Sequence, residues 1–324
     1  MMQDTLNTMS SSNRQDMFDL PVNTDVMFAN HKNIYMPAVE KRQRKLLQKI
    51  SFIKPFLHEN ETILCVTTGC SPAPVIEQFL TGWIIFYLKR SLFIFTNERV
   101  FHVPTKYNFA YRNSIAQILY VDCQNITVKG RTLIAEYKSG KKEKFFYIPK
   151  SESKKIKNLL QQTPLEGQPG PTAERIHLCP RCTNPLIKDQ YICPTCALEF
   201  KDKEQARKIS IIYPGGGYFY TGHPFLGIGD AITEVYLTLL FILVLLATIS
   251  NVAAGLFPLI FVGAILALEK ILTVYHSNHF IKEYIPNDRS VEIIMTIPEE
   301  GQYPQQTAPQ PKPEEVLSAG WRSL

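Results

Sequence analysis

The stretch that decides how this chain is organised is residues 179–196, CPRCTNPLIKDQYICPTC, in which two Cys-x-x-Cys pairs are separated by ten residues. Each pair places two thiolates on one tight turn, and the intervening hairpin can bring both turns together into the four-sulfur shell that Zn²⁺ prefers. We therefore predict one structural zinc ion held by Cys179, Cys182, Cys193 and Cys196. Because protein would fill all four positions, catalysis at the metal is not expected.

This spacing resembles the zinc ribbons of many bacterial membrane and regulatory proteins. The resemblance implies a small module over residues 177–200 that folds mainly through its metal, because about thirty residues bury little core. Those ribbons usually have glycine after the second cysteine of each pair, where this chain has Thr183 and Ala197. A redox dithiol and a nucleic-acid contact through Arg181 and Lys188 are the alternatives.

The remaining cysteines, the N-terminal residues and the net charge place few limits on the location and partners of the protein. Cys65, Cys70 and Cys123 show no pairing pattern, which favours a reducing cytosolic environment for the soluble part. The opening residues lack a basic segment followed by an apolar one, so no cleavable secretory signal is expected. The net charge of +6 over 324 residues suits contact with anionic lipid or nucleic acid without choosing between them.

Downstream of the cysteines lies the most apolar part of the chain. Residues 235–249 and 252–268 are nearly charge-free runs, each near the lower limit for crossing a hydrocarbon core of about 30 Å. Basic residues flank both outer sides, at 201–208 and at Lys270, so the positive-inside rule places both termini in the cytoplasm. We predict a two-span hairpin in the cytoplasmic (inner) membrane.

An antiparallel hairpin centred near Val252 would bring Glu234 level with Lys270, since each lies 18 residues from that centre. Pairing makes a carboxylate tolerable at that depth. The functional alternative is a proton or ion relay through Asp230, Glu234 and Glu269. Glycines along the runs would also permit homo-oligomers through close helix contact.

Before the first run stands YPGGGYFYTGHPFLGIG, residues 213–229. Its Pro-Gly-x-Gly-x-x-Tyr-x-Gly pattern resembles the entry motif of the paired-transmembrane-helix domain family over about residues 209–275. The Asp-containing signature common in that family's second span is absent, so no family role is carried over. Aromatic rings favour the headgroup zone. The predicted membrane-interface residues are Tyr218, Phe219, Tyr220, Glu234 and Lys270, with His223 interpreted as a turn residue.

Upstream, β-rich runs alternate with turn signals such as Gly130 and Gly140, and a helix follows from Ser151. This pattern predicts a small β-barrel closed by a C-terminal helix. A basic amphipathic helix from Pro37 should pack on the barrel, with a membrane-surface contact as the alternative. The expected strands are 62–68, 92–103, 115–122, 126–128, 132–137 and 144–148.

Residues 92–103, LFIFTNERVFHV, resemble the two apolar strands and Thr-Asn-x-Arg turn of bacterial pleckstrin-homology-like (PH-like) and GRAM-like domains. The resemblance covers about residues 45–162 and implies their barrel and C-terminal helix. An insertion at 74–90, PVIEQFLTGWIIFYLKR, has an apolar core too short to span a bilayer. It is either a buried element or an interfacial segment. The candidate lipid or partner contacts are Trp83, Lys89, Arg90 and Arg99.

The chain is therefore predicted to be a multidomain α+β protein. No catalytic Ser/His/Asp or Cys/His arrangement, phosphate-cradling loop or carboxylate pair in a soluble cleft is recognisable, so an enzyme is not expected. The expected divisions are a disordered N-terminus (1–36), a PH-like domain with its leading helix (37–162), a linker (163–176), a zinc ribbon (177–200), a membrane hairpin with its Gly/Tyr-rich entry (201–280) and a polar, mostly disordered tail (281–324).

The order of these parts favours a membrane-anchored, non-enzymatic binding or scaffold protein. Its PH-like domain and ribbon would contact lipid headgroups or an unknown protein partner. One alternative is a small transport or channel component that uses Asp230 and Glu234. Another is a membrane-tethered nucleic-acid-binding protein, which is less expected because the ribbon carries few basic residues.

Overall fold

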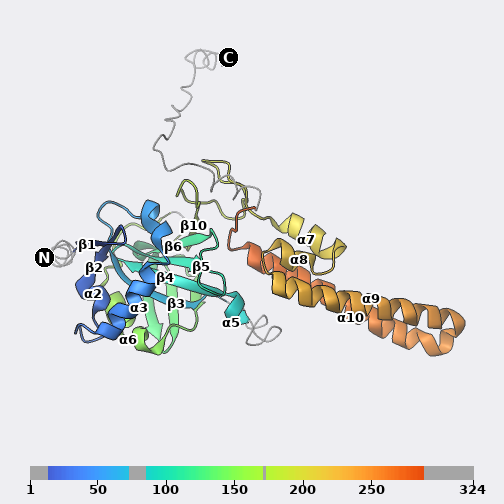
Figure 1. Ribbon diagram of the computed structural model, residues 1–324. Coiled ribbons are helices and arrows are strands. Elements are labelled where there is room, and N and C mark those ends of the chain that lie inside the picture. The colour runs from blue at the N-terminus through green and yellow to red at the C-terminus, as the bar shows by residue number, and fades with distance from the viewer. Residues whose placement is uncertain (1–13, 73–84, 171–172, 288–324) are drawn as a thin grey trace, which may run out of the picture.

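The computed structural model describes residues 14–72, 85–170 and 173–287. These residues form a β domain, a small cysteine-rich module and a long two-helix hairpin that extends away from the β domain (Figure 1). The mixed α+β class is confirmed, and so are two long apolar helices near the C-terminus.

Two sheets build the β domain. The larger has the strand order β1-β2-β3-β4-β5-β6-β10 and the smaller has the order β7-β8-β9. All neighbours pair antiparallel except β2 and β3, which meet in parallel at Val22 and Ile63. The strands are β1 (Arg14–Met17), β2 (Leu20–Asn23), β3 (Ile63–Cys70), β4 (Arg90–Thr96), β5 (Arg99–Pro104), β6 (Ile115–Leu119), β7 (Cys123–Lys129), β8 (Thr132–Tyr137), β9 (Lys142–Phe145) and β10 (Ile176–Leu178).

The strands β4 and β5 are buried at nearly every position because both of their faces are covered. Successive side chains of a strand point to opposite faces. Phe93 and Phe95 therefore join the core between the two sheets, while Leu92 and Ile94 join a second core under the N-terminal helices. This double burial accounts for a continuous apolar run in place of strict alternation.

Short helices cover the sheets. The helix α3 packs on the β domain as expected, because the buried Gln43 side chain bonds the main chain of Val66 in both directions, at 2.8 and 3.0 Å. Ile156 and Leu160 of α6 complete the core between the sheets. The helical segments of this domain are α2 (Thr24–Phe28), α3 (Pro37–Leu47), η1 (Ser51–Phe56), α5 (Ile85–Leu88), η3 (Tyr120–Asp122) and α6 (Lys150–Gln162).

The expectation of disorder over residues 1–36 is wrong from residue 14 onward. This segment forms β1, β2 and α2, and Leu20 and Val22 are fully buried against the main sheet. The side chain of Asn23 caps α2 by accepting from the amide of Val26 at 3.1 Å. The short apolar stretch of β2 lies within polar sequence, yet it forms a strand because it pairs with the edge of β3. Residues 1–13 lie outside the described residues.

The expected flexible linker over 163–176 is also corrected. The amide of Gly170 donates to Asp122 at 2.6 Å, and the Ser139 hydroxyl donates to the carbonyl of Ala173 at 2.9 Å. The chain then enters β10, which pairs with β6. The cysteine module, residues 177–200, is therefore attached directly to the main sheet.

Four helices lie between residue 203 and the end of the described chain at residue 287. They are α7 (Lys203–Ile212), α8 (Gly216–Tyr220), α9 (Pro224–Ser250) and α10 (Val252–Ile281). The last two, called the hairpin below, run side by side and break at Asn251, next to the expected turn (Figure 1). Gly215 has φ +67°, and a Cβ there would lie 2.1 Å from the carbonyl oxygen of Gly227, so only glycine lets α8 approach α9 this closely.

Both hairpin helices are long and apolar enough to cross a membrane, and both exceed the runs expected from sequence. Only 11% and 6% of their most apolar windows are buried in the protein, so their side chains face outward. A helix of a soluble core would instead be mostly covered. Residues 282–287, which were expected to belong to the polar tail, fold against the cysteine module.

Candidate metal centre and the hairpin beside it

The four cysteines predicted as ligands lie together. Their sulfurs all lie within 4.8 Å of one another. The Sγ atoms of Cys179 and Cys196 are 3.5 Å apart, and those of Cys182 and Cys193 are 3.6 Å apart. A tetrahedral zinc site with Zn–S bonds of about 2.3 Å requires sulfur separations of about 3.8 Å. The donor set and its spacing therefore fit a metal ion held by four thiolates.

Main-chain amides donate hydrogen bonds to the cysteine sulfurs, and such donors stabilise the negative charge of a thiolate. Burial raises the pKa of the Cys193 thiol, but hydrogen bonds from the amides of Cys196 and Thr195, and from the thiols of Cys182 and Cys196, together bring it down to about 7. The amides of Cys182 and Arg181 also bond the Cys179 sulfur, but burial outweighs them there and raises the pKa of that thiol. Since metals bind the thiolate form, amide donors to the sulfurs of both cysteine turns suit their role as metal ligands.

The other three cysteines take no part in the cluster. Burial raises the pKa of Cys65 and of Cys123 to about 12, and that of Cys70 to about 11. All three are buried in the β domain as free thiols. They are packing residues that stay protonated.

The turn after each cysteine pair adopts a left-handed conformation. Thr183 has φ +61° and Ala197 has φ +55°, the two positions where similar modules usually have glycine. Their amides close the turns onto the carbonyls of Cys179 and Cys193 at 2.9 and 3.0 Å. A residue with a Cβ pays about 1–2 kcal/mol to adopt this conformation. The presence of Thr183 and Ala197 in place of glycine therefore adds backbone strain but does not change the geometry of the turns.

Replacing Thr183 or Ala197 by glycine is expected to stabilise the metal-bound module. Relief of the left-handed strain outweighs the added flexibility of the unfolded chain, leaving about 0.5–1 kcal/mol for each site. The measurement is the concentration of a competing chelator that removes half of the metal, which should rise. Thr195→Gly is the matched control, because Thr195 is not among the residues with positive φ, and this variant should lose metal more easily. Equal behaviour of all three variants would contradict the strain argument.

The chain beyond the hairpin closes the cysteine module. Tyr284 packs into the small core around the cysteines, and its hydroxyl accepts from the amide of Asp189 at 2.7 Å and donates to the carbonyl of Ile187 at 3.2 Å. The amide of Lys201 donates to the carbonyl of Ile285 at 2.9 Å. Sequence reasoning missed this closure because Tyr284 lies far along the chain from the cysteines and no local pattern marks it.

The predicted pairing of Glu234 with Lys270 is confirmed. Glu234 is 2% exposed, and the Lys270 ammonium lies 2.6 Å from its Oε2 atom. Lys270 also donates to the carbonyl of Ser210 at 2.9 Å, which ties α7 to the hairpin. One ligand oxygen from each of Asp230, Glu234 and Glu269 lies within 4.8 Å of the others, so the three carboxylates named for a relay do come together.

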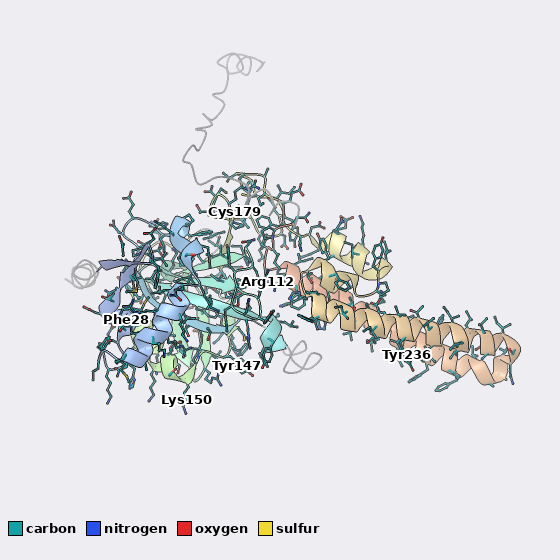
Figure 2. The ribbon with its side chains drawn as sticks, in the orientation of Figure 1. Phe28, Arg112, Tyr147, Lys150, Cys179 and Tyr236 are labelled. Atoms are coloured by element: carbon teal, nitrogen blue, oxygen red, sulfur yellow. The ribbon has the colours of Figure 1, made fainter. Side chains whose placement is uncertain are left out.

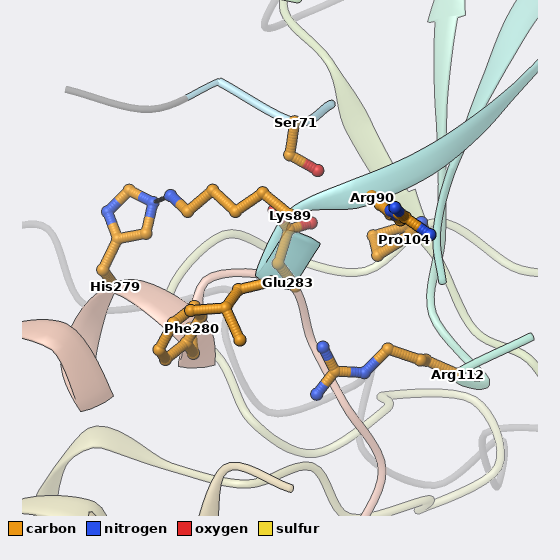
Figure 3. A pocket seen from close by; sticks show the side chains of 9 residues that line it. Ser71, Lys89, Arg90, Pro104, Arg112, His279, Phe280 and Glu283 are labelled. Atoms are coloured by element: carbon orange, nitrogen blue, oxygen red, sulfur yellow. Dashed lines mark hydrogen bonds between the residues drawn. The ribbon is translucent and has the colours of Figure 1, made fainter. Parts of the chain in front are cut away.

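The β domain meets the base of the hairpin through basic side chains (Figure 3). The Lys89 amine hydrogen-bonds His279 of α10. Arg112 donates to the carbonyl of Thr221 at 3.0 Å and lies 3.2 Å from Nε2 of His223. Lys89, His279 and Arg112 border a cavity of only about 10 Å³, which is room for about one water molecule.

His223 acts within the fold at this junction, in agreement with its interpretation as a turn residue. Its ring stacks on Phe280 with centroids 4.0 Å apart. Burial, and after it the charge of Arg112, hold the pKa of His223 well below its usual value. The imidazole is therefore neutral, and its Nε2 accepts from Arg112. Arg112 had no sequence signal, since it lies in a loop between strands.

The residues predicted as lipid or partner contacts differ in their burial. Arg99 is 4% exposed and pairs with Glu61 through two bonds of 2.9 and 2.6 Å, so its assignment as a lipid or partner contact is wrong. Arg90 is half-buried and Lys89 is buried at the junction. Trp83 lies outside the described residues.

The three aromatic residues of the entry motif, which were predicted to lie at the membrane interface, differ in their exposure and contacts. Tyr218 turns inward, where its hydroxyl lies 2.7 Å from Nδ1 of His276. The Tyr220 hydroxyl accepts from the amide of Asp202 at 3.2 Å. Phe219, at 44% exposed, is the one of the three that presents a large free surface. Tyr218 therefore contributes to packing within the fold rather than to an outer belt.

Comparison with known proteins provides no family assignment. No protein-family model, curated protein or solved structure matches this chain.

Proposed function

We propose that this chain is a membrane-anchored, non-enzymatic binding or scaffold protein. The observation that carries the proposal is the hairpin, whose two helices are long enough to span a bilayer and leave their apolar side chains uncovered. An exposed apolar surface of that size is unfavourable in water, whereas contact with lipid tails is favourable. Both termini and the β domain would then lie on the cytoplasmic side.

The finer identities of the soluble parts belong to this proposal. The four-strand meander β3 to β6 faces the three strands β7 to β9, and α6 completes the core between them. This layout supports a PH-like domain, a fold whose role would be to bind lipid headgroups or a protein. The four-sulfur cluster supports a structural zinc ion in a ribbon. With four protein ligands, such a metal stabilises the fold and takes no substrate.

Alkaline carbonate extraction of cell membranes tests the anchor. The full chain should remain in the pellet, while Leu239→Arg with Leu243→Arg should move to the supernatant or fail to insert. These side chains are 57% and 63% exposed, and a charge at the centre of a span is strongly disfavoured. Ile34→Arg with Tyr35→Arg is the control, because both residues are 58% exposed on the β domain. Release of the unmodified chain would refute the anchor.

A second candidate function is a transport or channel component. The observation that favours it is the group of three carboxylates on α9 and α10, with the Thr273 hydroxyl 3.1 Å from Asp230 and 3.0 Å from Glu269. Polar groups inside a hairpin of this kind often mark an ion path. Proton flux into proteoliposomes decides between the functions. A relay loses its flux on Glu269→Gln, whereas an anchor shows no flux with either chain.

A further inference from the structure

The end of the β domain that faces the hairpin is strongly basic. Three segments form it, 85–91, 104–114 and 129–132, and none of them contains an acidic residue, although Glu283, beyond α10, lines the same cavity as Arg112. The first two bear the contacts to α10 and to the loop before α9. The third joins them because the amide of Ile148 bonds the carbonyl of Arg131, and the ring of Tyr147 lies 4.3 Å from that of Phe86 on α5. The basic residues are Lys89, Arg90, Lys106, Arg112, Lys129 and Arg131.

The length of exposed apolar surface on α9 places this end at the height of lipid headgroups. Residues 225 to 250 number 26, which at about 1.5 Å per residue span about 39 Å, close to the full thickness of a bilayer with its interfacial layers. Phe225, at the near end, is 81% exposed. Arg112 contacts Thr221 and His223, only a few residues earlier. The same end of the β domain therefore lies beside the near interfacial layer.

Exposed aromatic rings accompany the charges on this end. Tyr87, Tyr107 and Tyr147 are 48%, 67% and 43% exposed. Arg90 lies 4.5 Å from the ring of Tyr87 and donates to the carbonyl of Tyr107 at 2.6 Å, and Arg131 lies 5.4 Å from the ring of Tyr147. We call these five residues the aromatic–basic rim. Figure 2 shows Arg112 between the β domain and the hairpin, and Tyr147 on the side of the β domain that α5 occupies.

We propose that the aromatic–basic rim binds the headgroups of anionic phospholipids in the bilayer that the hairpin crosses. The proposal rests on the proposed anchoring and adds the partner of the β domain. Tyrosine favours the interfacial layer because its ring is apolar and its hydroxyl is polar. Arginine pairs with phosphate through two parallel hydrogen bonds. A surface that carries both, has no acidic neighbour in its segments and lies at headgroup height is complementary to an anionic lipid layer.

Photocrosslinking from three exposed tyrosines tests the rim. The full chain is reconstituted in lipid nanodiscs with p-benzoyl-phenylalanine in place of Tyr107, Tyr236 or Tyr35, which are 67%, 65% and 58% exposed. Tyr236 lies near the middle of α9 and reports insertion (Figure 2). Tyr35 precedes α3, away from the hairpin, and is the negative control. Lipid adducts should form at Tyr107 and Tyr236 and be absent at Tyr35.

The outcomes separate this proposal from the anchor on which it rests. Adducts at Tyr236 without adducts at Tyr107 overturn the rim and leave the anchor standing. Adducts at neither site overturn both. Equal adducts at Tyr107 and Tyr35 overturn the rim because the contact would then be unspecific.

A lipid comparison tests the anionic preference. The adduct yield at Tyr107 should be higher in discs of phosphatidylcholine with phosphatidylglycerol than in discs of phosphatidylcholine alone. Arg90→Gln with Arg131→Gln should bring the yield down to that of phosphatidylcholine alone. The control, Lys41→Gln with Lys45→Gln on α3, should keep the difference. Equal yields in the two lipids for the unmodified rim overturn the proposal.

Discussion

A chain with Cys193→Ser is expected to lose its bound zinc and the structure of the cysteine module. A serine hydroxyl is a poor zinc ligand at neutral pH, and metal binding in such modules contributes about 10–16 kcal/mol to folding. Metal analysis of the purified full chain measures the loss, and hydrogen exchange of residues 177–200 measures the unfolding. Cys123→Ser is the control, because this thiol is fully buried in the β domain and lies outside the cluster.

The same variant should loosen the end of α10. Residues 282–287 depend on the module through the Lys201 to Ile285 bond and the packing of Tyr284. Hydrogen exchange should therefore rise in this segment as well, although no metal ligand lies there. Full zinc content in the Cys193 variant, or no zinc in the unmodified chain, would contradict the assignment.

Lys270→Met is expected to lower the free energy of unfolding by about 3–5 kcal/mol, because it leaves the carboxylate of Glu234 buried without its ammonium partner. Glu234 is 2% exposed, and its second oxygen has no hydrogen-bond partner among the described residues. Reversible unfolding in mixed micelles measures the change. The double variant with Glu234→Gln should recover much of the loss, since no unpaired charge remains.

A double-mutant cycle makes this prediction specific. If the pair matters as a pair, the effect of Lys270→Met in the Glu234→Gln background is much smaller than in the unmodified chain. Equal effects in the two backgrounds would show that Lys270 acts through Ser210 alone.

The sequence was sufficient to predict those features of the structure that depend on the spacing of residues along the chain. The two cysteine pairs predicted the cluster, and symmetry about the hairpin turn predicted the contact of Glu234 with Lys270. The runs 62–68, 92–103 and 132–137 located β3, β4 with β5, and β8, whereas residues 120–122 form η3 and β9 spans Lys142–Phe145 in place of 144–148.

What sequence missed depends on partners far away in the chain. The strands β2 and β10 are short, and each exists because an existing sheet edge receives it. Arg99 looked like an exposed turn residue until its partner Glu61, 38 positions earlier, placed it in a buried ion pair. Tyr284 gains its role only when the end of α10 returns to the cysteines. Such long-range contacts leave no period or motif in a single sequence.

Labelling of a single cysteine at the hairpin turn tests the central claim, a two-span anchor with the β domain and cysteine module in the cytoplasm. Ser250→Cys changes an exposed residue at the end of α9, and the seven native cysteines serve as internal controls. A membrane-impermeant maleimide should label this variant in intact cells. The unmodified chain should be labelled only after the membrane is dissolved and the protein denatured. Failure to label Ser250→Cys from outside, or labelling of the unmodified chain in intact cells, would contradict the account.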